Sequence, residues 1–196
     1  MNQTQREFRS IDDDFRPKIL RYLTRLVGER EAEDLTQVVM LKISSRLPDF
    51  RGDSSLATWI YRIATNTAID RLRRPQVGAA GGEALEDENL PLEVAAMSAE
   101  SAAIRGEMNA CIHEFIERLP ESYRTAMVLS ELEGFKNAEI AAILGISLDT
   151  VKIRLHRARE KLRRDLQSGC SFHRDTRNEL GCDRMPAVVA SPPRDR

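Results

Sequence analysis

The sequence has few aromatic residues, few cysteines and no long apolar run, and each shortage excludes a class of protein. Aromatic residues make up 5% of the 196 residues, which fits helical bundles better than a β-sandwich. No segment approaches the roughly 18–20 apolar residues of a membrane helix, and residues 1–15 lack the apolar core of a secretory signal. The three cysteines are widely spaced and do not suggest a disulfide framework. We therefore expect a cytoplasmic protein without a membrane segment.

The sequence also has little of what catalytic sites need. It contains no Ser/His/Asp or Cys/His arrangement on regular elements, no glycine-rich phosphate loop, and no set of metal ligands before residue 168. We therefore expect no enzymatic activity and no cofactor.

The charge is nearly balanced in total but strongly segregated along the chain. There are 30 Lys and Arg residues against 31 Asp and Glu residues. The segment 75–107 contains one base, Arg105, and seven acids: Glu83, Glu86, Asp87, Glu88, Glu93, Glu100 and Glu107. Basic residues gather on both sides of it, most densely between Ile146 and Leu166. Two basic lobes joined by an acidic segment favour a polyanion bound at two places, although two solvated helix faces would give the same pattern.

Apolar periodicity predicts three helices before residue 75. The first covers 15–27 and stops at Gly28, and the second ends before Pro48. The third covers 56–74, is capped by Ser54 or Ser55, and is ended by Pro75. The expected inward positions of the three helices are Ile19, Leu20, Leu23, Leu26 and Val27; Ala32, Leu35, Val39 and Ile43; and Leu56, Ile60, Ile63, Ala64 and Thr67.

The second half of the sequence predicts another helical lobe. It follows a segment whose composition, rich in glycine, alanine and acidic residues, is that of a linker. A stripe of Ile112, Phe115, Ile116 and Leu119 ends at Pro120, and a helix over 121–133 is closed by Gly134. A short helix over 136–144, a turn at Gly145 and a basic helix capped by Ser147 form a helix-turn-helix signature. In the basic helix, Val151, Leu155, Ala158 and Leu162 should face inward. We find no alternating β pattern of useful length.

These patterns predict an all-α protein of two small helical domains joined by a flexible acidic linker. The first domain covers 10–74, the linker 75–107, the second domain 108–167, and a tail 168–196.

Three stretches resemble one family. The segment LPESYRTAMVLSELEGFKNAEIAAILGISLDTVKIRLHRAREKLR (119–163) resembles region 4 of bacterial sigma factors, which reads the −35 promoter element. AEDLTQVVMLKI (32–43) resembles the region 2 helix that docks on the β′ clamp helices of RNA polymerase. FRGDSSLATWIYRIATNTAIDRLRR (50–74) resembles the regions that melt and read the −10 element. The order of the motifs, with a short linker between the two lobes, is that of the extracytoplasmic-function (ECF) group.

The resemblance implies roles for individual residues. Candidates for −35 base contacts are Lys152, Ile153, His156 and Arg157, and candidates for phosphate contacts there are Thr150, Arg154, Arg159 and Arg124. Asn66 and the loop Phe50, Arg51 and Gly52 would hold a flipped −10 base, while Arg62, Arg71, Arg73 and Arg74 steer phosphates. Trp59 is expected mainly to pack. Asp34 and Gln37 would face the clamp helices. The implied partners are core RNA polymerase, through the β′ clamp helices and the β flap, promoter DNA, and an anti-sigma factor. Restraint is expected from that anti-sigma factor or from the protein's own tail.

Three alternatives stay open at this level. The acidic linker is either an inert tether or a polyanion mimic, carried by Glu83, Glu86, Asp87 and Glu88, that lies toward the RNA exit path. The tail contains Cys170, His173 and Cys182, which are weak candidates for a metal site or a redox pair, or it has no chemistry of its own. A stand-alone helix-turn-helix regulator would need an upstream receiver or ligand domain, and the first lobe shows no βα alternation.

Overall fold

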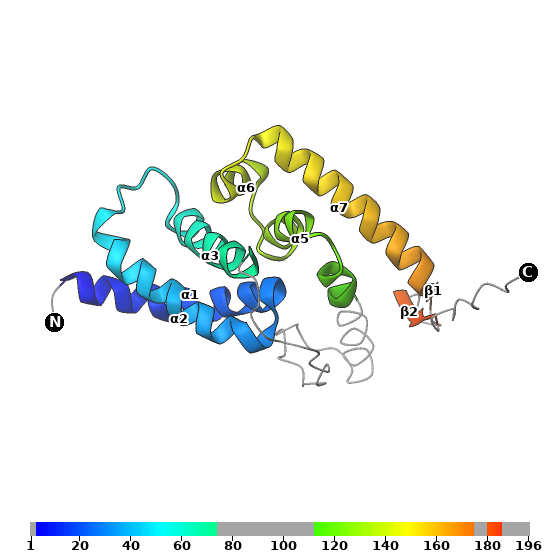
Figure 1. Cartoon of the computed structure of the whole chain (residues 1–196), viewed down its shortest axis with the longest axis horizontal. Coiled ribbons are helices and arrows are strands. Elements are labelled where there is room, and N and C mark those ends of the chain that lie inside the picture. Colours follow the sequence, from blue (N-terminus) through cyan, green and yellow to red (C-terminus); the bar gives the residue numbers. More distant parts are fainter. Residues whose placement is uncertain (1–2, 74–111, 175–179, 186–196) are drawn as a thin grey trace, which may run out of the picture. The chain divides into compact units, whose positions relative to one another are not determined.

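The structure, a computed structural model, describes residues 3–73, 112–174 and 180–185 (Figure 1). The N-terminal part contains α1 (Gln3–Val27), α2 (Glu29–Arg46), a 3-10 turn (Leu47–Asp49) and α3 (Leu56–Arg73). The C-terminal part is helical over 112–117 and continues with α5 (Glu121–Met127), a π-helical turn (Val128–Leu132), α6 (Asn137–Leu144), α7 (Leu148–Gly169), β1 (Cys170–Arg174) and β2 (Leu180–Arg184). The prediction of a predominantly helical protein is confirmed.

Helices α1, α2 and α3 pack together as a bundle, which we call the first lobe (residues 3–73). Its fully buried side chains are Ile19, Tyr22, Leu23, Ala32, Val39, Ile43, Ile60, Ala64, Thr65 and Ala68. Three expected core positions of the first lobe are not buried, since Leu20 is exposed and Val27 and Leu56 are half-buried. Leu20 is 36% exposed because Ile19, Tyr22, Leu23 and Leu26 form the inward stripe. Leu56 is only half-buried because it opens the first turn of α3.

Helix α1 begins at Gln3, twelve residues before the predicted start at Phe15 (15 − 3 = 12). The extra turns carry Phe8 and Ile11, which are half-buried and precede Phe15 at spacings of three and four residues. This continuation of the helical period was present in the sequence and was overlooked.

Two serines cap helices in the same way. The backbone N–H of Thr58 donates to Ser55 Oγ at 3.1 Å, and the backbone N–H of Thr150 donates to Ser147 Oγ at 3.1 Å. Each bond satisfies an N–H that has no partner within its helix. The caps predicted at the starts of α3 and α7 are therefore confirmed, with Ser55 rather than Ser54 at α3.

Residues 119–159 form a second lobe built on a helix-turn-helix. Gly145 ends α6 in the left-handed conformation, with φ of 64°, which a glycine adopts without a Cβ penalty. The turn leads into α7, where Val151, Leu155 and Ala158 are buried as predicted and Leu162 is half-buried. The predicted helix over 121–133 is wrong in one respect, because α5 passes at Val128 into a π-helical turn. The described residues of the first and second lobes belong to one compact unit.

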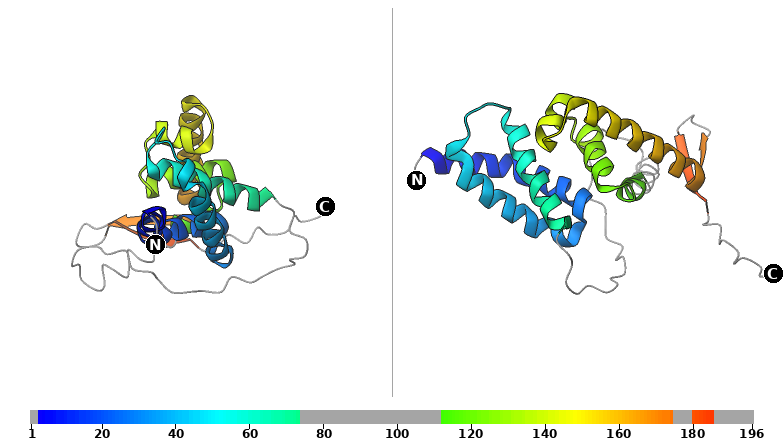
Figure 2. Two further views of the ribbon diagram at one scale, coloured as in Figure 1. Left: turned by 90° about the vertical axis from the view of Figure 1, so that its left-hand side faces the viewer. Right: turned by 45° about the horizontal axis from the view of Figure 1, so that its top comes forward.

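The tail contains an antiparallel hairpin that the sequence analysis missed (Figure 2). Strand β1 follows α7 without a break, and its register places Phe172 opposite Cys182 and His173 opposite Gly181. Residues 112–118 and the described residues from 160 onward belong to a second compact unit. Among the described helices, none is both long and apolar enough to cross a bilayer.

Candidate nucleic-acid interface

One face of α7 combines basic and apolar side chains in solvent. Lys152, Ile153, His156 and Arg157 are all exposed, and Ile153 keeps 52% of its surface in water. They lie opposite the buried stripe Val151, Leu155 and Ala158, which fixes the helix on the second lobe. An exposed isoleucine beside basic groups suits a DNA groove, where a thymine methyl and guanine acceptors lie next to each other. The structure thus brings the four predicted base-contact residues together.

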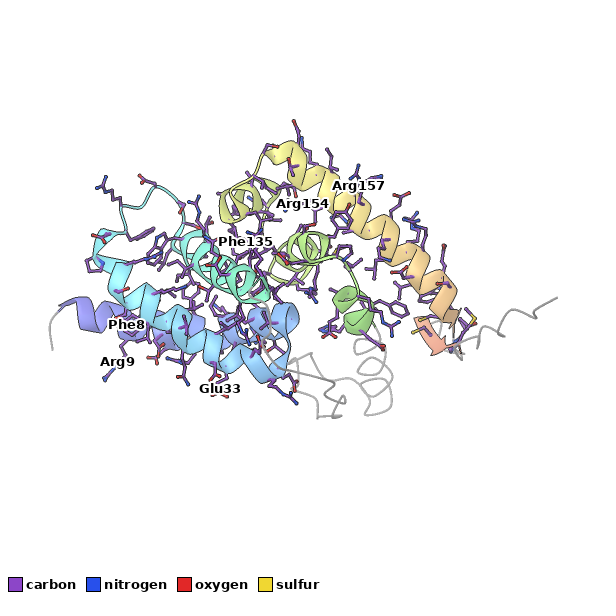
Figure 3. The ribbon with its side chains drawn as sticks, in the orientation of Figure 1. Phe8, Arg9, Glu33, Phe135, Arg154 and Arg157 are labelled. Carbon is purple, nitrogen blue, oxygen red and sulfur yellow. The ribbon has the colours of Figure 1, made fainter. Side chains whose placement is uncertain are left out.

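Two of the α7 residues predicted to contact phosphate already interact with other side chains of the protein. Thr150 Oγ1 lies 2.8 Å from Ser147 Oγ, and Arg159 Nη2 donates to Glu131 Oε1 at 2.6 Å. Arg154 is half-buried on the same helix, where Figure 3 labels it with Arg157. Arg124 is half-buried on α5, so the helix before the helix-turn-helix contributes one further predicted basic residue.

A second candidate site lies on α3 and the loop before it. Arg62 and Asn66 are exposed one helical turn apart. In the loop, Gly52 has a φ of 77°, which places the chain in the left-handed region that favours glycine. The Phe50 ring packs at 5.1 Å from that of Trp59, tilted by 43°. The loop therefore rests on α3 through an aromatic pair, as expected for a packing role of Trp59.

The other basic residues predicted at this site lie in different environments. Arg73 is exposed at the end of α3. Arg71 is half-buried, and its Nη2 donates to Glu31 Oε1 on α2 at 2.7 Å. Arg74 lies outside the described residues, as do the linker acids Glu83, Glu86, Asp87 and Glu88.

The outer face of α2 is a third candidate surface. Asp34 and Gln37 are exposed there, and they are accompanied by Val38 and Leu41, which are 40% and 70% exposed. The four positions follow the helical spacing of three and four, opposite buried Leu35, Val39 and Ile43. The sequence analysis missed Val38 and Leu41, although an apolar pair off the core stripe was visible in the sequence. We call Asp34, Gln37, Val38 and Leu41 the α2 patch.

A polar network inside the first lobe was also missed. The hydroxyls of Tyr22 and Thr65 lie 2.7 Å apart, and Thr65 Oγ1 donates to the carbonyl of Tyr61 at 2.6 Å. Burial raises the pKa of Tyr22 well above its usual range. Burial, together with donation to the carboxylate of Glu133, raises the pKa of Tyr61 in the same direction. Both phenols therefore stay protonated and act as hydrogen-bond donors or acceptors without charge.

The tail residues Cys170, His173 and Cys182 are not brought onto one face. Alternation along the antiparallel pair places Cys170 and Cys182 on one side of the hairpin and His173 on the other. Cys182 lies opposite Phe172, so the two cysteines are diagonal neighbours, at a separation larger than the roughly 3.8 Å between Cβ atoms that a disulfide needs. Among the described residues no group of three or more His, Cys, Asp or Glu side chains is placed to hold a metal ion.

Comparison with known families gives two matches in the order of the two lobes. Residues 12–76 match the family described as Sigma-70 region 2. Residues 109–162 match the family described as Sigma-70, region 4.

Curated relatives are similar over most of their length. The chain is 38% identical over 161 residues to RNA polymerase sigma-H factor of Pseudomonas aeruginosa, a match covering 78% of this chain and 82% of the relative. It is 34% identical over 170 residues to ECF RNA polymerase sigma factor SigW of Bacillus subtilis, covering 83% and 90%. It has the same identity to the ECF RNA polymerase sigma-E factor of Escherichia coli, covering 83% and 88%.

Two solved structures share the fold at lower identity. One is CnrH in complex with the cytosolic domain of CnrY, with a TM-score of 0.60, 24% identity, and coverage of 84% of this chain and 90% of that one. The other is the sigma factor RpoE in complex with the anti-sigma factor NepR from Bartonella quintana, with a TM-score of 0.63, 21% identity, and coverage of 82% and 97%.

Proposed function

The chain belongs to the sigma-70 family of RNA polymerase sigma factors, in its ECF group, and we propose how its residues carry out that role. The protein binds core RNA polymerase, recognises the −35 and −10 promoter elements, and promotes the melting that starts transcription. It acts in the cytoplasm and catalyses no reaction of its own. The boundaries we assign are 10–74 for region 2, 75–107 for the linker, 108–167 for region 4 and 168–196 for the tail.

The exposed face of α7 is the observation that carries the proposal. The N-terminal turns of a recognition helix enter the major groove, and the capped start of α7 carries Lys152, Ile153, His156 and Arg157 in solvent. Lys152 and Arg157 are suited to guanine O6 and N7, and Ile153 to a thymine methyl. Thr150, Arg154, Arg159 and Arg124 contact phosphates, which set the register of the helix on the duplex.

The −10 element is read by the loop before α3 and by the exposed face of α3. A base flipped out of the stack needs hydrogen-bonding groups beside an apolar surface. Asn66 supplies an amide, and the loop supplies Phe50, Arg51 and Gly52. Arg62, Arg73 and Arg74 attract the backbone of the melted strand. Arg71 has a second role in our proposal, because its pairing with Glu31 joins α3 to α2.

We assign binding of core polymerase to the α2 patch. Asp34 accepts charge-assisted hydrogen bonds from basic residues of the β′ clamp helices, and Gln37 adds a neutral one. Val38 and Leu41 bury apolar surface in the same contact, since they are the exposed large hydrophobic side chains of α2. Region 4 contacts the β flap.

Two further elements of the proposal concern restraint and the linker. An anti-sigma protein holds the chain inactive, a proposal supported by membership of the ECF group and by a fold shared with an RpoE solved in complex with the anti-sigma factor NepR. The acidic linker passes along the polymerase toward the RNA exit path, where Glu83, Glu86, Asp87 and Glu88 take the place of nascent RNA.

The proposal is tested by transcription with purified components. Core RNA polymerase, the protein and sheared bacterial genomic DNA are mixed, and the 5′ ends of the transcripts are sequenced. We expect discrete start sites that are absent with core enzyme alone. A protein that shifts duplex DNA by itself but yields no start sites with core enzyme would instead be a stand-alone regulator.

A further inference from the structure

The first turn of α7 carries an acidic residue that has no role in the function proposed above. Asp149 lies two residues after the capping Ser147, and its side chain is 85% exposed. Three of the proposed base-contact residues follow it at spacings of three, four and seven: Lys152, Ile153 and His156. These spacings place residues on one face of a helix. Asp149 therefore shares the exposed face that is proposed to enter the major groove.

A carboxylate on this face is unfavourable for DNA binding in general. Both strands of the duplex carry phosphates, which repel an exposed negative charge that enters the groove. The positive end of the helix dipole favours an acid in the first turn. It would favour one equally at Leu148 or Thr150, so the dipole does not account for an acid on the DNA-facing side. An acid there lowers the affinity for every sequence except one that offers it a hydrogen-bond donor, which is a means of specificity.

Cytosine is the base that offers a carboxylate the better partner. The amino groups exposed in the major groove are N4 of cytosine and N6 of adenine. Adenine also presents the acceptor N7 beside its amino group, and this acceptor repels a carboxylate. An amide has the opposite preference, because it can accept from adenine N6 and donate to N7 at the same time. Asp149 is therefore suited to cytosine, and an asparagine in its place would be suited to adenine.

Lys152 extends the match from one base to a base pair. Its Nζ lies 3.4 Å from Oδ1 of Asp149, so a donor and an acceptor stand side by side on the exposed surface. In a C·G pair, the cytosine N4 donor and the guanine O6 acceptor also stand side by side in the major groove. The Lys152 side chain is 57% exposed, which leaves its ammonium group accessible to guanine. The two side chains together present the pattern that is complementary to one C·G pair.

We propose that Asp149 is a specificity-determining residue of α7 and that, with Lys152, it selects a C·G base pair at one position of the −35 element. Asp149 accepts a hydrogen bond from N4 of the cytosine, and Lys152 donates to O6 of the paired guanine. This inference rests on the proposed function, because it names one base pair that the −35 contact reads. Arg157 lies about two helical turns further along α7 and reads a different base pair.

The test compares the base preferences of holoenzymes. Core RNA polymerase with wild type, Asp149→Asn or Asp149→Ala transcribes a promoter library randomised over the −35 region, with a transcribed barcode that identifies each −35 sequence. We expect wild type to prefer cytosine at one position by about fivefold or more, the lower end of what one good base contact discriminates. Asp149→Asn should change that preference to adenine, and Asp149→Ala should abolish it. The preferences at the other −35 positions should stay as in wild type.

Glu160→Gln is the matched control. Glu160 is exposed on α7 and lies about three turns after Asp149 on the same face, roughly 16 Å further from the start of the helix. Each substitution removes one negative charge, so both should raise the affinity for all promoters alike. Only Asp149→Asn should change a preferred base. The proposal is overturned if Asp149→Asn keeps the wild-type preference at every position, or if Glu160→Gln changes the same base.

The same measurements separate this inference from a role in helix stability and from the proposed function. An Asp149 that only stabilises the start of α7 would give variants with lower unfolding midpoints and equal losses on all −35 sequences, which would overturn the proposal. Defined start sites with a −35 preference that does not depend on Asp149 would leave the sigma role standing and remove the inference. Failure of wild type to give start sites with core enzyme would remove the sigma role, and the inference with it.

Discussion

Arg159 on α7 donates to Glu131 across 2.6 Å, so a residue proposed to contact DNA phosphate is already engaged by a carboxylate. To reach a phosphate, its guanidinium must leave that partner. Both side chains are about half exposed, at 57% and 45%, and pairs of this kind contribute about 0.2–1 kcal/mol. The competition between Glu131 and DNA is therefore weak enough to be reversed on binding.

Glu131→Gln should strengthen promoter binding by the holoenzyme, because Arg159 no longer has a competing carboxylate. The expected gain is about 1.5- to 5-fold in affinity, the value of an exposed ion pair. Filter binding at several salt concentrations measures it. Unchanged affinity would mean that Arg159 does not leave Glu131 for DNA.

Substitutions on α7 should separate base contacts from phosphate contacts. Lys152→Ala or Arg157→Ala should reduce the preference for the correct base at one −35 position by about 1–3 kcal/mol. Binding to promoters that lack that base should be weakened less. Arg154→Ala should weaken binding to all promoters alike. The slope of log affinity against log salt concentration should fall by about one, as expected for the loss of one phosphate contact. Competition binding with single-position −35 variants distinguishes these outcomes, and a sequence-independent loss for Arg157→Ala would contradict its assignment.

The two serine caps offer a paired test of how much each helix start contributes. Ser55→Ala and Ser147→Ala should each reduce the free energy of unfolding by about 1 kcal/mol, the usual cost of losing a cap. Only Ser147→Ala should also weaken −35 recognition, because it loosens the first turn of α7. Chemical denaturation and promoter binding measured on the same preparations check both parts. Equal loss of −35 binding in the two variants would contradict the assignment of α7.

Periodicity and capping rules predicted the parts of the structure that depend on neighbouring residues. Val151, Leu155 and Ala158 followed from the 3.6-residue repeat, and the caps at Ser55 and Ser147 from local chemistry. The burial of Tyr22 could also have been predicted, because Tyr22 stands three residues after buried Ile19. It was overlooked because tyrosine is a polar aromatic residue.

Other features could not be predicted from the sequence, since they depend on contacts between residues that are far apart along the chain. Nothing near Glu133 indicates that its partners are Arg25 and Tyr61, far away in the chain. The hairpin after α7 lacks the strict alternation that marks a strand, and only the register of β1 with β2 shows that His173 lies away from the cysteines.

The buried tyrosines should make the fold sensitive to alkali. Burial raises the pKa of Tyr22 and Tyr61 above the ordinary value of 10.0. Since the folded state holds these protons more tightly than the unfolded state, stability is full below pH 10 and declines as pH rises above it. Urea unfolding between pH 8 and pH 11 should show this decline, and it should be smaller in Tyr22→Phe than in wild type. An equal decline in both proteins would rule out ionisation of Tyr22 as a cause.

The α2 patch should matter for polymerase and not for folding. Leu41 is 70% exposed, so Leu41→Glu should leave the unfolding midpoint nearly unchanged while lowering affinity for core polymerase at least tenfold, because the charge would be buried in the contact. Leu20→Glu is a matched control, since Leu20 is an exposed leucine on α1. Pull-down with core enzyme compares them, and equal binding by both variants would remove Leu41 from the docking surface.

The central claim is that α7 selects the −35 element for an RNA polymerase holoenzyme. The most direct measurement transcribes a promoter library, randomised over the −35 region, with core enzyme and either wild type or Arg157→Ala, and sequences the transcripts. We predict that wild type enriches a defined −35 sequence and that Arg157→Ala relaxes it at one position while the start site stays fixed. Transcripts with no −35 preference, or none at all with core enzyme, would contradict the claim.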